Sequence, residues 1–454
     1  MYYKLLQDNK KLSEQSQSQQ FLLRQSHSFL SSFLEHLDEK LDKRLVRTFF
    51  NLFIGILMFR NRTNGLILSE LGGFITGFKK AAAGTKRISN LLRSKKWTGS
   101  TISDFFIKTG KKRLETLHEK GKKGYFLWDD SVLEKHESWF SEGLCAVRSS
   151  KAKRITKVKR GYYRAPKSSI RVPGFHWSSV VLSAWGEKPF TVLMSWWTTR
   201  GKEKDSADNV FYKMLRKITQ TFGKGYTHVL DRGYANLPTL ERLWKFEQGF
   251  IIRWKTSHLL LIGQGKYEGT IKQTHLVARS FKAMDYRMVY DKERKQNKRI
   301  SIAYAKVFHP EYPDKELYLV IARDKNHKMK PMYILTSECV DSIGMAWEIL
   351  FAYMMRWNIE QVFRFMKTEL AIESIRLWFW DNRLKLLHIL SLVYDFIVHL
   401  ANNWKRWVMS FTHEWEPRTG KRNRPKYSVP LYRFRAALSK ALMPLVYELM
   451  KQRE

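Results

Sequence analysis

Four polar residues recur at regular spacing in an apolar stretch near the end of the chain. They are Tyr353, Arg356, Glu360 and Lys367. The steps between them are three, four and seven residues, and on an α-helix these steps return to nearly the same face. A glutamate beside an arginine and a lysine can form an ordinary helix ion pair, which contributes roughly a few tenths of a kcal/mol. The stripe therefore indicates chemistry only if other acids join it.

Further acids follow short hydrophobic runs that have the composition of buried strands. Asp129 and Asp130 follow YFLW, and Asp231 follows THVL. An ionised carboxylate at the end of such a strand needs a nearby cation or the solvent edge. Mg²⁺ suits these positions, because it is a hard ion that binds carboxylates together with the phosphate oxygens of a substrate. Two such ions roughly 4 Å apart would activate the attacking oxygen and stabilise the leaving oxygen in a phosphoryl displacement.

The charge balance indicates a polyanionic partner. Lys and Arg number 82 against 42 Asp and Glu, and 82 − 42 gives a formal net charge of +40. A basic excess of this size points first to nucleic acid. The hydrophobic fraction of 44% is enough for a sizeable core, which excludes a disordered chain.

The cysteines and the apolar runs indicate the cellular compartment of the protein. Cys145 and Cys339 are far apart and form no CxxC pair, so we expect no disulfide framework or zinc site, and a reducing cytosol fits. The run Phe49–Phe59 is shorter than the roughly 20 residues of a membrane helix. Lys385–Leu400 contains two histidines and an aspartate. Both are interpreted as core helices, with no membrane partner. The glycine-containing segments lack P-loop spacing, so no nucleotide cofactor is expected.

A basic segment at 81–113 is a candidate DNA-binding unit. It reads as short helices joined by Gly and Ser turns, and it carries Lys86, Arg87 and Arg93. One interpretation is a unit like a helix-turn-helix, and the other is a solvated basic helix. The spacing of the residues does not decide between the two.

A second basic segment, 148–167, holds nine Lys or Arg and no acid. Lys153, Arg154 and Lys157 belong to it. As a charge run alone it would be a mobile, solvated loop. Next to an active site on DNA it would clamp the phosphate backbone.

Hydrophobic periodicity divides the chain into helical and mixed regions. Apolar residues recur at helical spacing in the first part, whereas strands alternate with helices from about residue 122, which predicts an α/β architecture with a mixed sheet. The expected segments are a helical DNA-binding domain at 1–115, a first core part at 116–257, a β-rich insertion at 258–340, further core helices at 341–408, and a basic linker with a C-terminal helix at 409–454.

Together these motifs resemble those of bacterial insertion-sequence DDE transposases. The four-residue stripe matches the YREK signature of that family at every position, within RWNIEQVFRFMK. VLDRGY resembles the strand of the second aspartate. FLWDDS resembles the strand of the first, where Asp129 and Ser131 fit D-x-[ST], although the family more often has threonine. From Asp231 to Glu360 there are 360 − 231 = 129 residues, which resembles the β insertion of the family.

The resemblance implies a fold and a catalytic site. The fold would be α/β, with a ribonuclease H-like mixed-sheet core, a mostly β insertion, a helical N-terminal domain and a helical C-terminal region. Asp129, Asp231 and Glu360 would be the catalytic residues and would hold two Mg²⁺ or Mn²⁺ ions. Asp130 remains the alternative to Asp129, because the register of the strand is not visible in the sequence.

The resemblance also implies partners and roles. Tyr353, Arg356 and Lys367 would bind phosphates of the transposon end, and Arg232 is a further candidate for that role. The partners would be double-stranded DNA of the transposon ends and of the target, with a homodimer in a synaptic complex. The location would be the cytoplasm, at the bacterial nucleoid. Two other functions remain open: a structure-specific nuclease or resolvase on the same core, and a non-catalytic DNA-binding derivative of a transposase.

Overall fold

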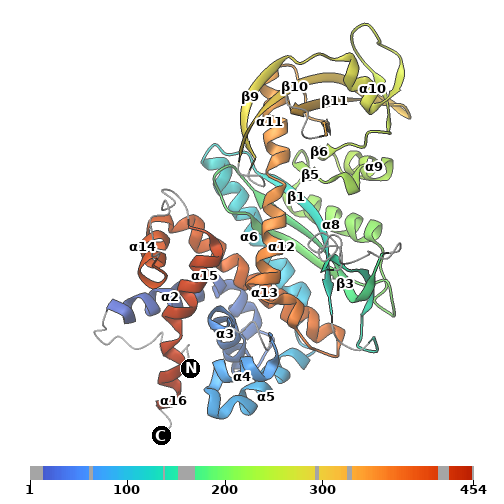
Figure 1. Cartoon of the computed structure of the whole chain (residues 1–454). Helices are drawn as coiled ribbons and strands as arrows, with labels where there is room; N and C mark the ends of the chain where they lie inside the picture. The colour runs from blue at the N-terminus through green and yellow to red at the C-terminus, as the bar shows by residue number, and fades with distance from the viewer. Residues whose placement is uncertain are drawn as a thin grey trace, which may run out of the picture.

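The computed structural model of the chain describes residues 14–60, 65–135, 139–151, 169–291, 296–324, 330–417 and 429–451. It has a mixed α/β architecture, as the sequence predicted. Helices from both ends of the chain gather on one side of the sheet, and the elements of 258–340 lie at the opposite end of the molecule (Figure 1).

The described strands form one mixed sheet. Its main path runs β2-β3-β1-β5-β6-β12-β11-β10-β7-β8, and β4 pairs with β3 while β9 pairs with β10. The strands are β1 (Tyr125–Glu134), β2 (Cys145–Arg148), β3 (Arg171–Ser183), β4 (Phe190–Trp197), β5 (Thr227–Leu230), β6 (Gly249–Arg253), β7 (Leu259–Ile262), β8 (Ile271–Gln273), β9 (Asp285–Asp291), β10 (Gln296–His309), β11 (Tyr312–Asp324) and β12 (Met332–Thr336).

Parallel strands lie at the centre of the sheet. β1 pairs with β5, and β5 with β6, in parallel, whereas β3 is antiparallel to β1 and β4 is antiparallel to β3. All four residues of β5 are buried. Hydrophobic runs without alternation are typical of strands covered on both faces, and the THVL run of β5 follows this rule.

β1 differs from the sequence-based expectation in its length. Asp129 and Asp130 were expected to close the strand, but β1 continues to Glu134 and stays paired with β3 throughout. Its pairing with β5, in contrast, covers only Phe126 and Leu127. The two acids therefore lie where β1 has left β5 and keeps only one neighbour. This leaves space beside them for other elements.

The strands of 258–340 are part of the same sheet. β12 pairs antiparallel with β6, and β11 and β10 continue from it. The region also contains helix α10 (Thr274–Ser280). The β-rich segment thus extends the central sheet through hydrogen bonds.

The other helices are concentrated in the first and last parts of the chain. They are α2 (Glu14–Asp38), α3 (Lys43–Met58), α4 (Leu68–Thr76), α5 (Ala81–Arg93), α6 (Gly99–Glu119), α8 (Ala207–Phe222), α9 (Leu237–Lys245), α11 (Ile343–Met354), α12 (Trp357–Thr368), α13 (Trp380–Asn403), α14 (Lys405–Trp415), α15 (Leu431–Leu442) and α16 (Pro444–Lys451), with short 3₁₀ turns η1 (Phe78–Lys80), η2 (Arg232–Tyr234) and η3 (Ile372–Ser374).

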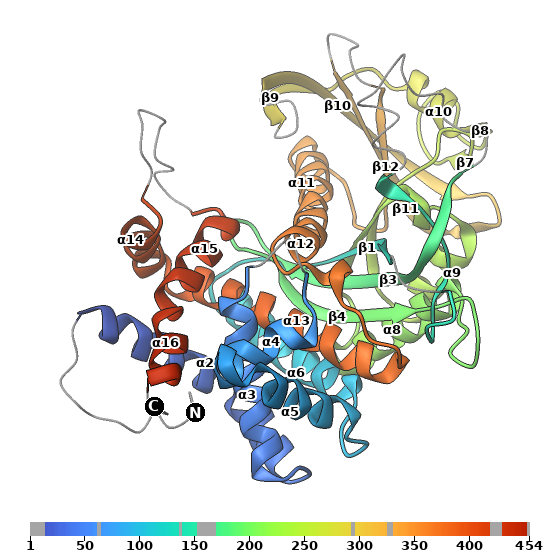
Figure 2. The same cartoon turned by 60° about the horizontal axis from the view of Figure 1, so that its bottom comes forward.

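Helix α13 is the central element of the helical part. It contacts α3, α5 and α6 from the N-terminal part and α14 and α15 from the C-terminal part, and it also packs on β4 (Figure 2). By length and composition alone α13 could cross a membrane, but 83% of its most apolar window is buried inside the protein. It is the core helix that the sequence predicted.

Two helices expected to be continuous are interrupted. The YREK stretch runs over the junction between α11 and α12, where the Arg356 N–H bonds to Tyr353 O at 3.0 Å in a tighter turn. The two helices still follow one another in a single column (Figure 1). The C-terminal segment, predicted as one amphipathic helix, is α15 followed by α16, which begins at Pro444. A proline is favoured at the first position of a helix and disfavoured inside one.

Candidate active site

Carboxylates from three distant parts of the chain meet around one guanidinium group. Arg356 Nη1 lies 3.2 Å from Asp129 Oδ2, and Arg356 Nη2 lies 2.5 Å from Glu360 Oε1. Arg356 Nε lies 3.9 Å from Asp231 Oδ1. The structure therefore brings together the three acids that the sequence singled out, and the arginine stands between them.

Each acid is placed by a different element. Asp129 is in β1, beyond the residues that pair with β5, and lies opposite Ser179 of β3. Asp231 directly follows β5 and is the N-cap residue of the 3₁₀ turn η2. Glu360 is in the first turn of α12, which packs on β1 and β3. Because β1 and β5 are parallel, the ends of their paired segments lie at the same edge, where α12 crosses.

Asp130 points to the other side of β1. Its carboxylate accepts a hydrogen bond of 2.8 Å from the Tyr234 hydroxyl. Burial raises the pKa of Asp130, against the hydrogen bonds from Ser178 and Tyr234. Successive side chains of a strand face opposite sides of the sheet, so only one of the two neighbouring aspartates can face Arg356. The geometry favours Asp129 as the member of the acid cluster.

The cluster carries more negative than positive charge. Burial raises the pKa of Asp129 to about 7; Arg356 opposes this shift, while Asp231 and Glu360 add to it. The Arg356 side chain is only 14% exposed. A single guanidinium supplies one positive charge for three carboxylates, and in a partly buried site this imbalance favours protonation or a further cation.

Tyr353 joins the cluster, whereas Lys367 does not. The Tyr353 hydroxyl donates to Asp231 Oδ1 at 3.3 Å. Lys367 Nζ donates to Val132 O at 2.7 Å and lies 3.6 Å from Glu373 Oε1. It is therefore held farther along β1. The polar stripe predicted from helical spacing splits into two sites, because the residues reach different points of β1 and β5.

Within the described ranges, the other predicted DNA-contact residues form no ion pair with the three carboxylates. Arg232 is exposed in η2, and Lys86, Arg87 and Arg93 are exposed on α5. Lys153, Arg154 and Lys157 lie outside the described residues.

The residues of the cluster match the preference of a hard divalent ion. Three carboxylates provide the oxygen ligands that Mg²⁺ and Mn²⁺ prefer. Among the described ranges, however, no group of three His, Cys, Asp or Glu is already close enough to hold a metal, because Arg356 lies between the acids. Arg356 Nε is also buried without a hydrogen-bond partner in the described residues. The site fits a divalent ion if the arginine side chain moves.

Sequence reasoning missed two features of this site. The contact of Arg356 with Glu360 was visible as a four-residue helical step, but its contacts with Asp129 and Asp231 join residues more than a hundred positions apart. The Tyr234 hydroxyl that binds Asp130 was also missed, although Tyr234 stands three residues after Asp231 in DRGY.

Residues 196–396 match the family model of the transposase DDE domain. The matched segment contains Asp231, Arg356 and Glu360, and begins after Asp129. It supports a DDE transposase, a kind of enzyme that cleaves DNA and transfers strands.

Two other comparisons add little to this match. No curated protein matches the chain significantly. Among solved structures, the piggyBac transposase in a synaptic complex with hairpin DNA aligns with 91% of this chain and 73% of its own length, at 12% sequence identity and a TM-score of 0.43. A similarity of this size does not by itself establish the fold or the activity of this chain.

Proposed function

We propose that the protein is a DNA transposase of the insertion-sequence type with the YREK signature. It would bind the inverted-repeat ends of a transposon, cleave DNA strands and join them to target DNA. The observation that carries this proposal is the meeting of Asp129, Asp231 and Glu360 around Arg356. The match of 196–396 to the transposase DDE domain supports it.

The central strands support a ribonuclease H-like core. Along the order β4-β3-β1-β5-β6, the first three strands are antiparallel and the last two are parallel to β1. Asp129 lies in β1 and Asp231 directly follows β5, and these two adjacent parallel strands are at the centre of this order. In this proposal β12 and the strands beyond it are the insertion between the second aspartate and the catalytic glutamate.

Asp129, Asp231 and Glu360 would hold two Mg²⁺ or Mn²⁺ ions. When bound, such ions would activate the attacking oxygen and stabilise the leaving oxygen of the phosphodiester. The carboxylates would need to be ionised for this role. Burial raises the pKa of Asp129. Binding of the ions would therefore require Asp129 to lose its proton, and loss of the proton would in turn favour binding of the ions.

Arg356 would have two alternative partners. Without DNA, its guanidinium neutralises the carboxylates of the cluster. With DNA bound, the same planar group would pair with a phosphate of the transposon end, because guanidinium groups bind phosphate in a bidentate manner. Tyr353 and Lys367 would contact neighbouring phosphates. The move of Arg356 from acid to phosphate would open the space between the three carboxylates.

DNA would also contact basic residues outside the cluster. Lys86, Arg87 and Arg93 on α5 are exposed, and Arg232 lies next to Asp231. The net charge of +40 supports a duplex partner. A homodimer in a synaptic complex and a place at the bacterial nucleoid complete the proposal.

One assay tests the function. Purified protein is incubated with linear DNA that carries the inverted repeats flanking its gene, with Mg²⁺ or with EDTA. We expect Mg²⁺-dependent cuts at the repeat ends. Glu360→Gln should abolish cleavage but keep end binding, because most DNA-contact residues remain.

The assay also separates the alternatives. Cuts in branched DNA without regard to the repeats would indicate a structure-specific nuclease or resolvase. Binding without cuts would indicate a non-catalytic derivative. Cleavage by Glu360→Gln at the normal rate would show that the acid assignment is wrong.

A further inference from the structure

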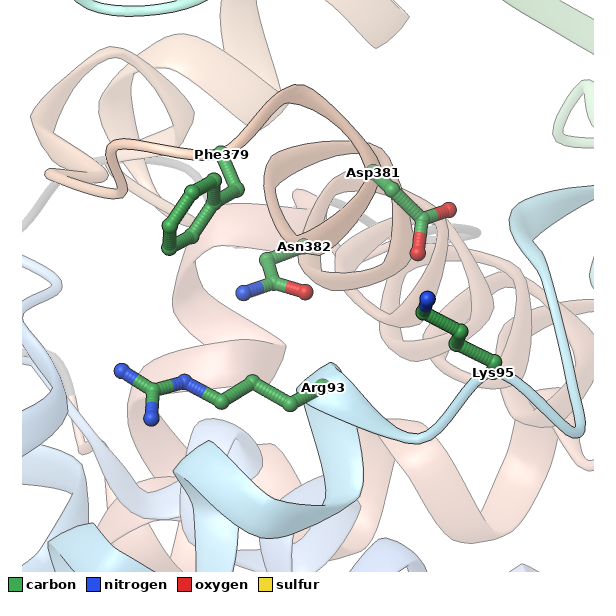
Figure 3. A pocket seen from close by; sticks show the side chains of 5 residues that line it. All are labelled: Arg93, Lys95, Phe379, Asp381 and Asn382. Carbon is green, nitrogen blue, oxygen red and sulfur yellow. The ribbon is translucent and has the colours of Figure 1, made fainter.

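A pocket lies between the end of α5 and the start of α13, away from the acid cluster. It has a volume of about 400 Å³ and is lined by Arg93, Lys95, Phe379, Asp381 and Asn382 (Figure 3). Arg93 is the last residue of α5, and Asp381 and Asn382 belong to the first turn of α13. The pocket thus joins the N-terminal helices to the helix at the centre of the molecule.

Its charged residues leave an excess of positive charge. Lys385 Nζ lies 2.5 Å from Asp381 Oδ2 and donates to Leu92 O and Ser94 O at 2.9 and 2.8 Å. The buried Lys385 therefore neutralises Asp381. Arg93 and Lys95 are exposed, and neither has an ion pair or hydrogen bond within the described ranges. The pocket thus presents two positive charges that no carboxylate balances.

Asn382 provides an independent sign of a ligand. This residue is only 8% exposed, yet its side-chain amide has no hydrogen-bond partner in the described part of the chain. Figure 3 shows the amide directed into the space between Phe379 and Arg93. Its amide atoms are not among the fully buried, unpaired polar atoms of the described residues, so they open into the pocket. A partner that is not part of this chain would satisfy it.

The start of α13 adds to the attraction for an anion. This helix spans 24 residues, and its N-cap residue, Phe379, provides no side-chain hydrogen bond. Glu142, which does not line the pocket, accepts from the Trp380 N–H at 2.9 Å. The Arg383 N–H bonds to Phe379 O at 3.1 Å, so the N–H groups of Asp381 and Asn382, together with the helix dipole, remain to favour a negatively charged ligand.

We infer that this pocket is a phosphate-binding site, occupied by a backbone phosphate of bound DNA. Arg93 and Lys95 pair with the phosphate oxygens, and the Asn382 amide donates to one of them. Phe379, which is 49% exposed, packs against the adjoining sugar or base. The choice of DNA as the source of the phosphate rests on the proposed function. Inorganic phosphate and a free nucleotide share the same chemistry.

Two pairs of variants test the pocket. Asn382→Asp puts a negative charge into it, and an acidic residue in the first turn of α13 is compatible with the helix dipole, so the fold should be kept. Asn297→Asp places the same charge on exposed β10, away from the pocket and from α5. The double variant Arg93→Ala with Lys95→Ala is matched by Lys111→Ala with Lys112→Ala, which removes two exposed cations of α6.

The affinity for a short DNA duplex is measured by fluorescence anisotropy at several salt concentrations. We expect Asn382→Asp to weaken binding roughly tenfold, as when a hydrogen bond to a charged group is lost, and Asn297→Asp to change it much less. Arg93→Ala with Lys95→Ala should reduce the slope of log affinity against log salt by about 1 relative to the α6 control. Equal effects of the pocket variants and their controls would overturn the inference.

A second arm identifies the source of the phosphate. Inorganic phosphate and a deoxynucleoside monophosphate are titrated into the same variants, with binding followed by ³¹P NMR. We expect both to bind weakly and to depend on Asn382. If they do so while duplex affinity is independent of Asn382, the assignment to DNA is overturned in favour of a free phosphate ligand.

The inference and the proposed function can fail separately. Unchanged duplex affinity in Asn382→Asp, together with Mg²⁺-dependent end cleavage by the unaltered protein, would reject the pocket and keep the transposase. Asn382-dependent duplex binding without any cleavage would keep the pocket and reject the transposase.

Discussion

At the residue scale, Arg356 determines the state of the acid cluster. Its guanidinium nitrogens lie between 2.5 and 3.9 Å from oxygens of Asp129, Asp231 and Glu360. The resemblance to DDE transposases implied that these three acids would meet, and the structure brings them together. The sequence could not predict that Arg356 would stand between them. These long-range contacts depend on how far β1 extends and on where α12 crosses it. The spacing of residues within one segment gives no information about either.

Arg356→Ala should uncover the metal preference of the cluster. Without the guanidinium, the three carboxylates repel one another, so we expect a loss of roughly 1–3 kcal/mol in the free energy of unfolding without metal. Mn²⁺ should then raise the melting temperature of the variant more than that of the unaltered protein. Arg364→Ala, which removes an exposed cation of α12, is the control. Equal effects of Mn²⁺ on the three proteins would contradict this role of Arg356.

The choice between Asp129 and Asp130 also belongs to this scale. The sequence left both open, since the same hydrophobic run precedes them. In the structure the alternation of β1 separates them, with Asp129 near Arg356 and Asp130 bonded to Tyr234. Which of the two side chains faces Arg356 depends on how β1 pairs with β3. A short sequence motif does not contain that information.

At the element scale, the N-terminal helices require a close crossing of α4 and α5. A Cβ on Gly84 would lie 2.2 Å from Gly72 O, and a Cβ on Gly72 would lie 2.3 Å from Ala81 O. The sequence predicted helices here from their periodicity. It did not predict the crossing, because a glycine in a helix can also mark a turn or an end, and 81–113 was interpreted as short helices joined by such turns.

Gly84→Ala should therefore destabilise the protein. Alanine normally stabilises a helix relative to glycine, by about 1 kcal/mol, but here the added methyl group meets backbone atoms. We expect a net loss of about 1–3 kcal/mol in unfolding free energy, measured by urea denaturation. Gly344→Ala in α11, where a Cβ would have only Ser342 Oγ within reach at 3.9 Å, should instead be neutral or stabilising. A stabilising Gly84→Ala would show that α4 and α5 do not cross this closely.

At the scale of the whole molecule, one sheet and one central helix unite the chain. β12 joins the strands of 258–340 to the core sheet, and α13 packs against helices from both ends of the chain. Composition and periodicity of the sequence predicted whether each of these segments is helical or β-rich. They did not predict that the β-rich segment would continue the core sheet, because strand pairing between distant segments leaves no local pattern.

The contact between α6 and α13 predicts a dependence of stability on pH. His388 Nε2 lies 2.9 Å from Ser103 Oγ. Burial and, to a lesser extent, the charge of Lys217 lower the pKa of His388 from 6.5 to about 4, against the hydrogen bond with Leu384 O. Because the folded-state pKa is below that of the unfolded chain, this histidine gives its full contribution above pH 6.5 and loses it as the pH falls toward 4.

The measurement is urea unfolding of the unaltered protein and of His388→Gln between about pH 7.5 and pH 5. Over the acid part of this range the unaltered protein should lose about 1.4 kcal/mol per pH unit more than the variant. His36→Gln, a change of a half-exposed histidine in α2, serves as the control for loss of an imidazole. A variant with the same pH dependence as the unaltered protein would contradict the buried, neutral state of His388.

The central claim is that Asp129, Asp231 and Glu360 bind the metal ions that cleave DNA, and a ligand exchange tests it most directly. Cleavage of inverted-repeat DNA is measured for Asp129→Cys and Asp231→Cys with Mg²⁺ and with Mn²⁺, and Asp130→Cys serves as the matched control. A thiolate is a poor ligand for Mg²⁺ and a better one for softer ions. We predict that the first two variants lose cleavage with Mg²⁺ and regain part of it with Mn²⁺, while Asp130→Cys cleaves with both. Cleavage by Asp129→Cys or Asp231→Cys at the normal rate with Mg²⁺ would contradict the claim.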